Sequence, residues 1–211
     1  MLARTPSNPR FGYVLAHGAG AGMLHPFLEH IAQALDERGV ATLRYEFPYM
    51  EEHRSRTDSP AVCAVRIREA IARAHAEWPG LPLFAGGKSF GGRMTSMAQA
   101  QQPLDGVRGL VFLGFPLHPP GKPGVTRAEH LDQVQVPMLF LQGSRDEFAQ
   151  LDLLTGVCEK LGERATLQVI EDGDHSFKVP KRSGRTAEQV LAELADRIVE
   201  WGIPLSAAPE Q

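Results

Sequence analysis

The chain has 211 residues, of which 43% are hydrophobic and 22% are charged, and its formal net charge is −3 at pH 7. A chain of this length is most simply one domain with a full hydrophobic core, and the composition is typical of a globular protein. The small negative charge excludes a general attraction to nucleic acid or to an anionic membrane, and no apolar segment is long enough to predict a membrane span.

The first ten residues are polar, contain two prolines and lack the apolar core of a signal peptide. A short apolar run at residues 11–16 predicts a strand, which leads into a glycine-rich loop at 17–23. A helix is predicted next, because its apolar residues share one stripe and a glycine follows them: Leu24, Phe27, Leu28, Ile31 and Leu35, then Gly39. Residues 40–45 predict the second strand.

The following segment, 46–58, is polar and predicts a loop. Ser59 and the proline after it mark the start of a helix, as an N-cap with proline in the first turn, and this helix is expected over 60–78. A third strand at 81–85 runs through a glycine-rich turn into a helix at 90–101.

Three more strands are predicted at residues 107–113, 136–141 and 165–170. The loop at 114–124 contains four prolines and three glycines in eleven positions, which forbids regular structure and stiffens the backbone. The last helix opens with a capping box formed by Thr186 and Gln189.

Short apolar runs that alternate with amphipathic helices predict an α/β fold, with about six mostly parallel strands and helices on both faces. We expect a single domain over residues 1–205 and a flexible tail at 206–211. The segment between the fourth and fifth strands is too short for a lid domain. In such a sheet the ligand site lies beyond the carboxyl ends of the strands.

The third strand ends in Gly87-Lys-Ser-Phe-Gly91, a G-x-S-x-G pattern typical of a nucleophile elbow. A serine at the tip of so tight a turn usually has a positive φ, and the backbone closes only if no side chain stands two positions before and after it. Gly87 and Gly91 meet that requirement around Ser89. The pattern alone also arises by chance or in phosphate-binding turns, but the spacing of a P-loop is absent.

Two other loops at the same edge carry groups that could activate Ser89. His175, after the sixth strand, is the candidate base, and Asp146, after the fifth strand, could orient its imidazole. The order serine, aspartate, histidine, each just past its own strand, is that of an α/β-hydrolase. Other carboxylates nearby stay open as alternatives: Glu147, Asp172 and Asp174.

The backbone N–H groups of Phe90 and Ala19 are the expected oxyanion hole, because small residues let the backbone approach a developing negative charge. We expect an open cleft bordered by the side chains of His118, Phe47 and Tyr49, which favours small or accessible acyl groups. The histidines show no metal-ligand spacing, so we expect neither a metal nor another cofactor.

Two cysteines and two basic residues are interpreted as lying outside the catalytic chemistry. Cys63 and Cys158 fall on apolar helical stripes and are predicted to be core residues, which by default indicates a reducing, cytoplasmic location. Lys88 and Arg93 could attract an anionic substrate, but we favour solvated positions or a supporting role beside the site.

The chain resembles the α/β-hydrolase superfamily, near its dienelactone-hydrolase-like group. More narrowly, it is similar to the branch that includes the animal testis-expressed hydrolase-like protein, the non-specific-lethal complex subunit and bacterial relatives. The segments that carry the resemblance are 16–23, 44–49, 86–93, 113–123, 141–146 and 172–175. The resemblance implies Ser89, Asp146 and His175 as a catalytic triad. A dienelactone hydrolase would use cysteine as its nucleophile, so the serine here departs from that activity.

The leading hypothesis is a serine hydrolase that cleaves small ester or thioester substrates through an acyl-enzyme. A peptidase or dienelactone-type activity is the enzymatic alternative. An interaction scaffold that retains the fold is the other, because one animal relative acts as a complex subunit. The expected partner is a small-molecule acyl substrate, with no nucleic acid and no membrane, and the sequence does not indicate an oligomeric state.

Overall fold

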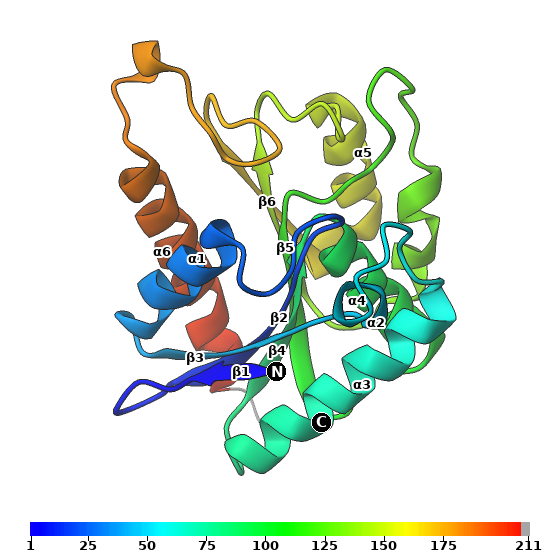
Figure 1. The fold of residues 1–211 in the computed structure, drawn as a ribbon. Helices are drawn as coiled ribbons and strands as arrows, with labels where there is room; N and C mark the ends of the chain where they lie inside the picture. The colour runs from blue at the N-terminus through cyan, green and yellow to red at the C-terminus, as the bar shows by residue number, and fades with distance from the viewer. Residues whose placement is uncertain (208–211) are drawn as a thin grey trace.

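The computed structural model describes residues 1–207 and contains one seven-stranded sheet between two layers of helices (Figure 1). The strands are β1 Leu2–Arg4, β2 Phe11–Ala16, β3 Val40–Tyr45, β4 Leu83–Lys88, β5 Val107–Leu113, β6 Met138–Gly143 and β7 Ala165–Ile170. The α-helices are α1 Pro26–Asp36, α2 Pro48–Glu51, α3 Pro60–Glu77, α4 Phe90–Gln101, α5 Leu151–Leu161 and α6 Ala187–Ser206. Short 3₁₀ helices are η1 Thr126–Gln133, η2 Gly162–Arg164 and η3 Lys181–Ser183.

The strand order is β1-β3-β2-β4-β5-β6-β7, and every pair is parallel except β1 with β3. The predicted α/β fold with a mostly parallel sheet is therefore confirmed. Strands β2, β3 and β6 are buried along their whole length, as expected for a sheet that helices cover on both faces.

Helices α1 and α6 cover one face of the sheet, and α3, α4 and α5 cover the other (Figure 1). The layer of α1 and α6 packs on Phe11, Tyr13 and Leu15 of β2. Phe11 also contacts Phe84 of β4, with ring centroids 4.9 Å apart. The second layer packs around residues such as Phe112 and Phe140, whose ring centroids are 4.8 Å apart. The two cores hold the sheet rigid, so that the loops at its carboxyl edge start from fixed positions.

Cys63 and Cys158 are free and buried in the second core, which confirms their prediction as core residues. The predicted capping box of α6 is also present, with Thr186 and Gln189 each bonding to the backbone of the other. No helix within residues 1–207 has the length and apolar character needed to cross a bilayer.

The structure differs from the sequence expectation at both ends of the chain. Residues Leu2–Arg4 form an edge strand, β1, whereas a segment of three residues carries no strand pattern; pairing with β3 decides its conformation. The flexible tail is expected to begin at residue 206, but α6 extends through Ser206. Residues 208–211 of that expected tail lie outside the described residues.

Internal boundaries shift where proline or a short helix intervenes. Strands β4 and β6 start after Pro82 and Pro137, which lack the N–H that a ladder needs, and therefore begin two residues later than predicted. The predicted loop at 46–58 contains one helical turn, α2. The loop at 114–124 has no helix or strand, as predicted.

Candidate active site

Ser89 lies at the tip of the turn between β4 and α4, with φ 49° and ψ −114°. The predicted positive φ is confirmed. A β-carbon on Gly87 would lie 2.2 Å from the Ala16 carbonyl oxygen, and one on Gly91 would lie 2.4 Å from that of His17. The elbow therefore closes only because both positions are glycine.

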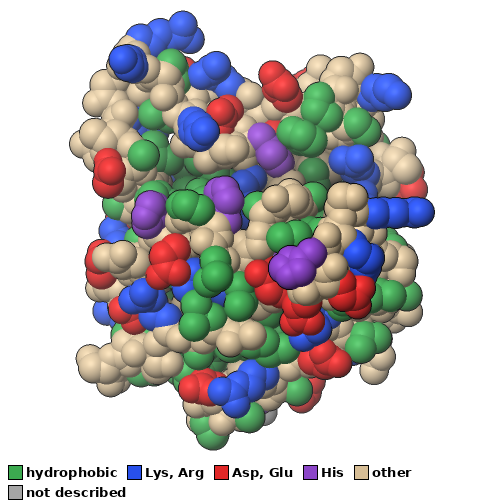
Figure 2. All heavy atoms as spheres, viewed as in Figure 1, with side chains coloured by type: hydrophobic (Ala, Val, Ile, Leu, Met, Phe, Trp, Pro, Cys, Tyr) green, Lys and Arg blue, Asp and Glu red, His purple; other side chains and the backbone are tan. Residues whose placement is uncertain are grey.

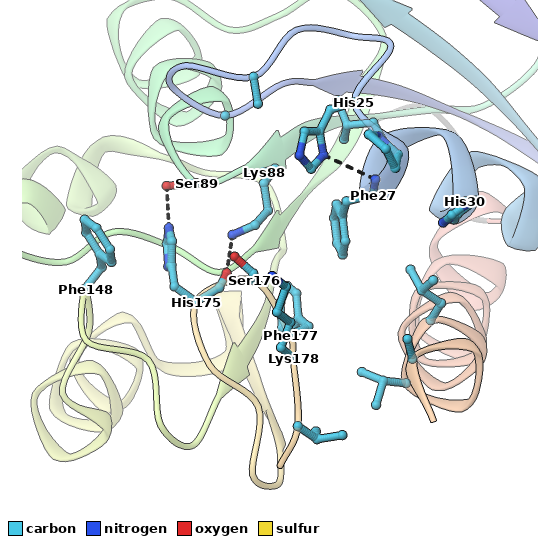
Figure 3. Close-up of a pocket in the computed structure, with 18 of the residues that line it drawn as sticks. His25, Phe27, His30, Lys88, Ser89, Phe148, His175, Ser176, Phe177 and Lys178 are labelled. Carbon is cyan, nitrogen blue, oxygen red and sulfur yellow. Dashed lines mark hydrogen bonds between the residues drawn. The ribbon is translucent and has the colours of Figure 1, made fainter. Parts of the chain in front are cut away.

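Three side chains predicted from separate loops form one continuous hydrogen-bonded chain. Ser89 Oγ lies 2.8 Å from Nε2 of His175, and Nδ1 of His175 lies 2.7 Å from Oδ2 of Asp146 (Figure 3). The carboxylate accepts only, so the Nδ1–H donates to Asp146 and Nε2 is left to accept from the serine hydroxyl. The arrangement can remove the serine proton as the oxygen attacks a substrate.

The carboxylate of Asp146 is buried and has two further donors. Gln142 Nε2 donates to Oδ2 over 2.5 Å, and the N–H of Phe148 donates to Oδ1 over 2.8 Å. Gln142 in turn accepts from the N–H of Phe115 over 2.9 Å, so it is held at both ends. Sequence reasoning missed Gln142; the signal was a polar residue inside the apolar strand β6.

The alternative carboxylates take other positions. Asp174 accepts from the N–H groups of Ser176 and Lys178 over 2.8 and 2.9 Å, which forms the tight turn that carries the histidine. Asp172 has a positive φ of 59° in the same loop, and Glu147 is exposed. Asp146 is the carboxylate that contacts His175.

The His175 loop is fixed from two sides. The ring of Phe148 packs on the imidazole with centroids 4.2 Å apart, and Lys88 Nζ donates to the His175 carbonyl oxygen over 2.5 Å (Figure 3). Gly143 permits the close approach of the loop to the end of β6, because a β-carbon there would lie 2.3 Å from the Gly173 carbonyl oxygen. The imidazole is therefore positioned by packing and by its own backbone, in addition to Asp146.

Lys88 is an internal cation of this site. Burial lowers its pKa from 10.5 to about 8, against the opposing attraction of Asp146 and Asp174. Of the roles weighed for Lys88 in the sequence, which were attraction of an anionic substrate, a solvated position and a supporting role, the supporting role fits its bond to the His175 carbonyl.

This lowered pKa predicts a pH dependence of stability. Between pH 8 and pH 10 the unfolded chain keeps the Lys88 proton that the folded protein has lost, so the free energy of unfolding rises with pH in that window. We expect the parent to gain about 2 kcal/mol over a Lys88→Met variant between pH 8 and pH 10 in urea unfolding. The comparison cancels groups that titrate in both proteins. Parallel pH curves would contradict the internal cation.

The two residues expected to supply oxyanion donors, Phe90 and Ala19, lie in the loops that meet at Ser89. Phe90 is the first residue of α4, where an N–H has no partner within the helix, and Ala19 lies in the cavity wall beside Ser89. Within residues 1–207 neither N–H donates to another backbone group. His17 anchors the loop that contains Ala19, because its Nε2 accepts from the N–H of Phe47 over 3.0 Å. Burial lowers the pKa of His17.

A cavity of about 740 Å³ opens at Ser89 and His175. Its walls are the loop after β2, the first turn of α1, the loop between β7 and α6, and the start of α6. Figure 3 shows Phe27 and Phe177 facing each other on this wall, with Ser89 and Lys88 at one end.

The prediction that His118, Phe47 and Tyr49 border the cleft is wrong. Phe47 and Tyr49 are 0% exposed and pack beneath the Ala19 loop, against His17 and Phe90. His118 is 3% exposed, and both ring nitrogens have partners: Nε2 accepts from the N–H of Gln150, and Nδ1 donates to the Pro119 carbonyl. These side chains support the loops, and none lines the cavity.

A second serine–histidine pair lies on the other side of α4. Ser96 Oγ and His130 Nε2 are 2.7 Å apart, and burial beside Arg93 lowers the pKa of His130 to about 4. Ser96 is 0% exposed and neither residue lines the cavity, so a substrate has no access to this hydroxyl. The pair joins α4 to η1.

Comparison with known proteins identifies relatives over nearly the whole chain. A family profile described as an alpha/beta hydrolase domain matches residues 9–202. The chain is also 27% identical over 199 residues to a Mycobacterium tuberculosis protein named as a phosphoribosyl transferase. That match covers 92% of this chain and 42% of the longer protein, so the chain spans about two-fifths of its curated relative.

Two solved structures share the fold. A dienelactone hydrolase from Anabaena variabilis superposes with a TM-score of 0.75 and 22% identity, over 96% of this chain and 89% of that one. XC6422 from Xanthomonas campestris, described as a serine hydrolase without a lid, gives a TM-score of 0.73 and 21% identity, over 98% and 89%. At these identities the likeness establishes the architecture alone.

Proposed function

Because the chain belongs to the alpha/beta hydrolase domain family, we propose that it is a serine hydrolase that cleaves small ester or thioester substrates through an acyl-enzyme. The observation that carries this proposal is the hydrogen-bonded chain from Ser89 through His175 to Asp146, which ends at a cavity of about 740 Å³. A volume of this size accommodates a small organic substrate.

In the proposed reaction, Ser89 Oγ attacks the acyl carbon while its proton passes to Nε2 of His175. Asp146 stabilises the resulting imidazolium through the Nδ1–H bond. The N–H groups of Ala19 and Phe90 would hold the oxygen of the tetrahedral intermediate, where one such donor contributes about 3 kcal/mol. The intermediate collapses as His175 protonates the leaving group. Water then attacks the acyl-enzyme by the same steps, and Ser89 recovers its proton.

Several features support an ester or thioester rather than a long polymer as substrate. The segment between β5 and β6 contains only the loop at 114–124 and η1, so no lid domain is inserted there. The cavity is walled on several sides by the chain itself, which suits a small acyl group. The narrower likeness to the testis-expressed and non-specific-lethal branch keeps a scaffold role as the alternative, and a labelling experiment separates the two.

We expect a fluorophosphonate probe to label the protein at Ser89, with one adduct by intact mass. Asp146→Asn should slow labelling by about 10³-fold to 10⁴-fold, because the amide favours the wrong imidazole tautomer. Glu147→Gln is the matched control, since it neutralises the adjacent exposed carboxylate and should label like the parent. A folded protein that stays unlabelled would favour the scaffold, and equal rates in the two variants would remove Asp146 from the triad.

A further inference from the structure

The cavity beside Ser89 has one strongly apolar side. Phe27 and Phe177 stack with ring centroids 5.8 Å apart, and the wall continues along α1 and α6 (Figure 3). The apolar residues of this side are Phe27, Leu28, Phe177, Val179, Val190 and Leu191. A hydrocarbon segment of a substrate would be removed from water here, which favours its binding.

The charges on the cavity wall are of one sign. The chain has 25 acidic and 22 basic residues, yet no Asp or Glu belongs to the described wall. Lys178 and Arg185 do, in addition to the internal Lys88. Figure 2 shows the Lys and Arg side chains that gather over the loop between β7 and α6, at the upper left of the view. The acidic residues of this loop, Glu171, Asp172 and Asp174, all precede His175, whereas the part from Ser176 to Thr186 has four basic residues and no acidic one.

Two of the acids near this wall are already bonded to other groups. Asp174 is used by the backbone N–H groups of its own turn, as described above. Glu193 is shared between the guanidinium groups of Arg185 and Arg197, so one negative charge faces two positive ones. Lys178 is exposed, and its ammonium group contacts no carboxylate within residues 1–207.

We propose that the acyl group of the substrate ends in an anionic group, such as a carboxylate, which lies at Lys178 and Arg185 while its hydrocarbon part lies along Phe27 and Phe177. This inference rests on the proposed function, because the acyl group is the part that becomes bonded to Ser89 Oγ and therefore occupies the cavity that opens there. The ester end meets the nucleophile, the chain crosses the apolar wall, and the charge is placed at the cationic rim.

The test compares two 4-nitrophenyl esters of the same eight-carbon diacid, one with a free distal carboxylate and one with that carboxylate methylated: mono-4-nitrophenyl suberate and methyl 4-nitrophenyl suberate. We expect kcat/KM to be about tenfold higher for the anionic ester at low ionic strength, and the advantage to shrink as salt is added. Equal values for the two esters would overturn the proposal.

A charge reversal locates the effect. Lys178→Glu should abolish or invert the preference for the anionic ester, measured as the ratio of kcat/KM for the two esters within the same variant. Arg10→Glu is the matched control, because it makes the same charge change on an exposed residue just before β2, at the opposite edge of the sheet. A preference that survives Lys178→Glu, or one that Arg10→Glu removes equally, would contradict an anion site at the rim.

Binding separates this inference from the proposed function. In the Ser89→Ala protein, monomethyl suberate should bind about tenfold more tightly than dimethyl suberate by titration calorimetry. If the anion binds but neither ester is hydrolysed by the parent, the anion site stands and the proposed function fails. If both esters are hydrolysed equally and the Ser89→Ala protein does not distinguish the two ligands, the function stands and the anion site fails.

Discussion

Ser89→Ala is expected to lower kcat for hydrolysis of 4-nitrophenyl acetate by at least about 10⁴-fold. The substitution removes the oxygen that forms the acyl-enzyme, while the oxyanion donors and the cavity remain, so the residual rate should still exceed that in water. Steady-state hydrolysis and single-turnover release of 4-nitrophenol measure this directly. Thermal unfolding should change little, because the variant removes one partly exposed hydroxyl.

Ser96→Ala is the control for this experiment, because Ser96 also bonds to a histidine but lies outside the cavity. We expect it to keep kcat within about twofold and to lose about 1 kcal/mol of stability, the usual net value of a hydrogen bond. Parent-like activity in Ser89→Ala would exclude Ser89 as the nucleophile. If instead a folded Ser96→Ala protein were inactive and Ser89→Ala active, Ser96 would be the nucleophile.

Gly87→Ala is expected to destabilise the protein by at least about 4 kcal/mol, a large part of the 5–15 kcal/mol typical of a domain. Gly87 has φ +145°, and an added β-carbon would lie 2.2 Å from the Ala16 carbonyl oxygen and 2.7 Å from the Ala16 nitrogen. Those atoms belong to the partner strand β2, which cannot retreat without breaking the sheet. Urea unfolding, or loss of soluble expression, would report the effect.

Gly20→Ala is the matched control for the backbone effect. Gly20 also has a positive φ, 73°, but nothing lies within 4 Å of its β-carbon position. Its substitution should cost only about 1 kcal/mol, from the left-handed conformation alone. If both variants unfold like the parent, the close approach of β2 to the elbow is not rigid, and the strained geometry of Ser89 would need another explanation.

Local chemistry made most of the fold and the proposed triad predictable. The glycines around Ser89 predict a turn that few other residues can form, and apolar runs separated by amphipathic helices predict a parallel sheet. In such a sheet all carboxyl ends point to one edge, so Asp146 and His175 could be placed near Ser89 before any distance was known. The observed 2.7 and 2.8 Å contacts agree with that placement.

The direction in which the site opens was not predictable in the same way. Aromatic residues near a catalytic loop look alike in a sequence whether they support the loop or contact a substrate. Phe47 and Tyr49 are 0% exposed, whereas Phe27 and Phe177 line the cavity. The difference arises because the cavity lies against α1 and the start of α6, while Phe47 and Tyr49 pack on Phe90 of α4.

What the amino-acid sequence determined by itself is therefore the set of reactive groups and the edge of the sheet at which they meet. Periodicity and turn chemistry are local, and they specify elements, their order and the residues at their ends. Only the tertiary structure decided the short pairing of β1, the support of Asp146 by Gln142, and the cationic cavity wall. Each of these depends on which distant segments pack together, and that is set by the summed burial of the whole core rather than by any one stretch of the chain.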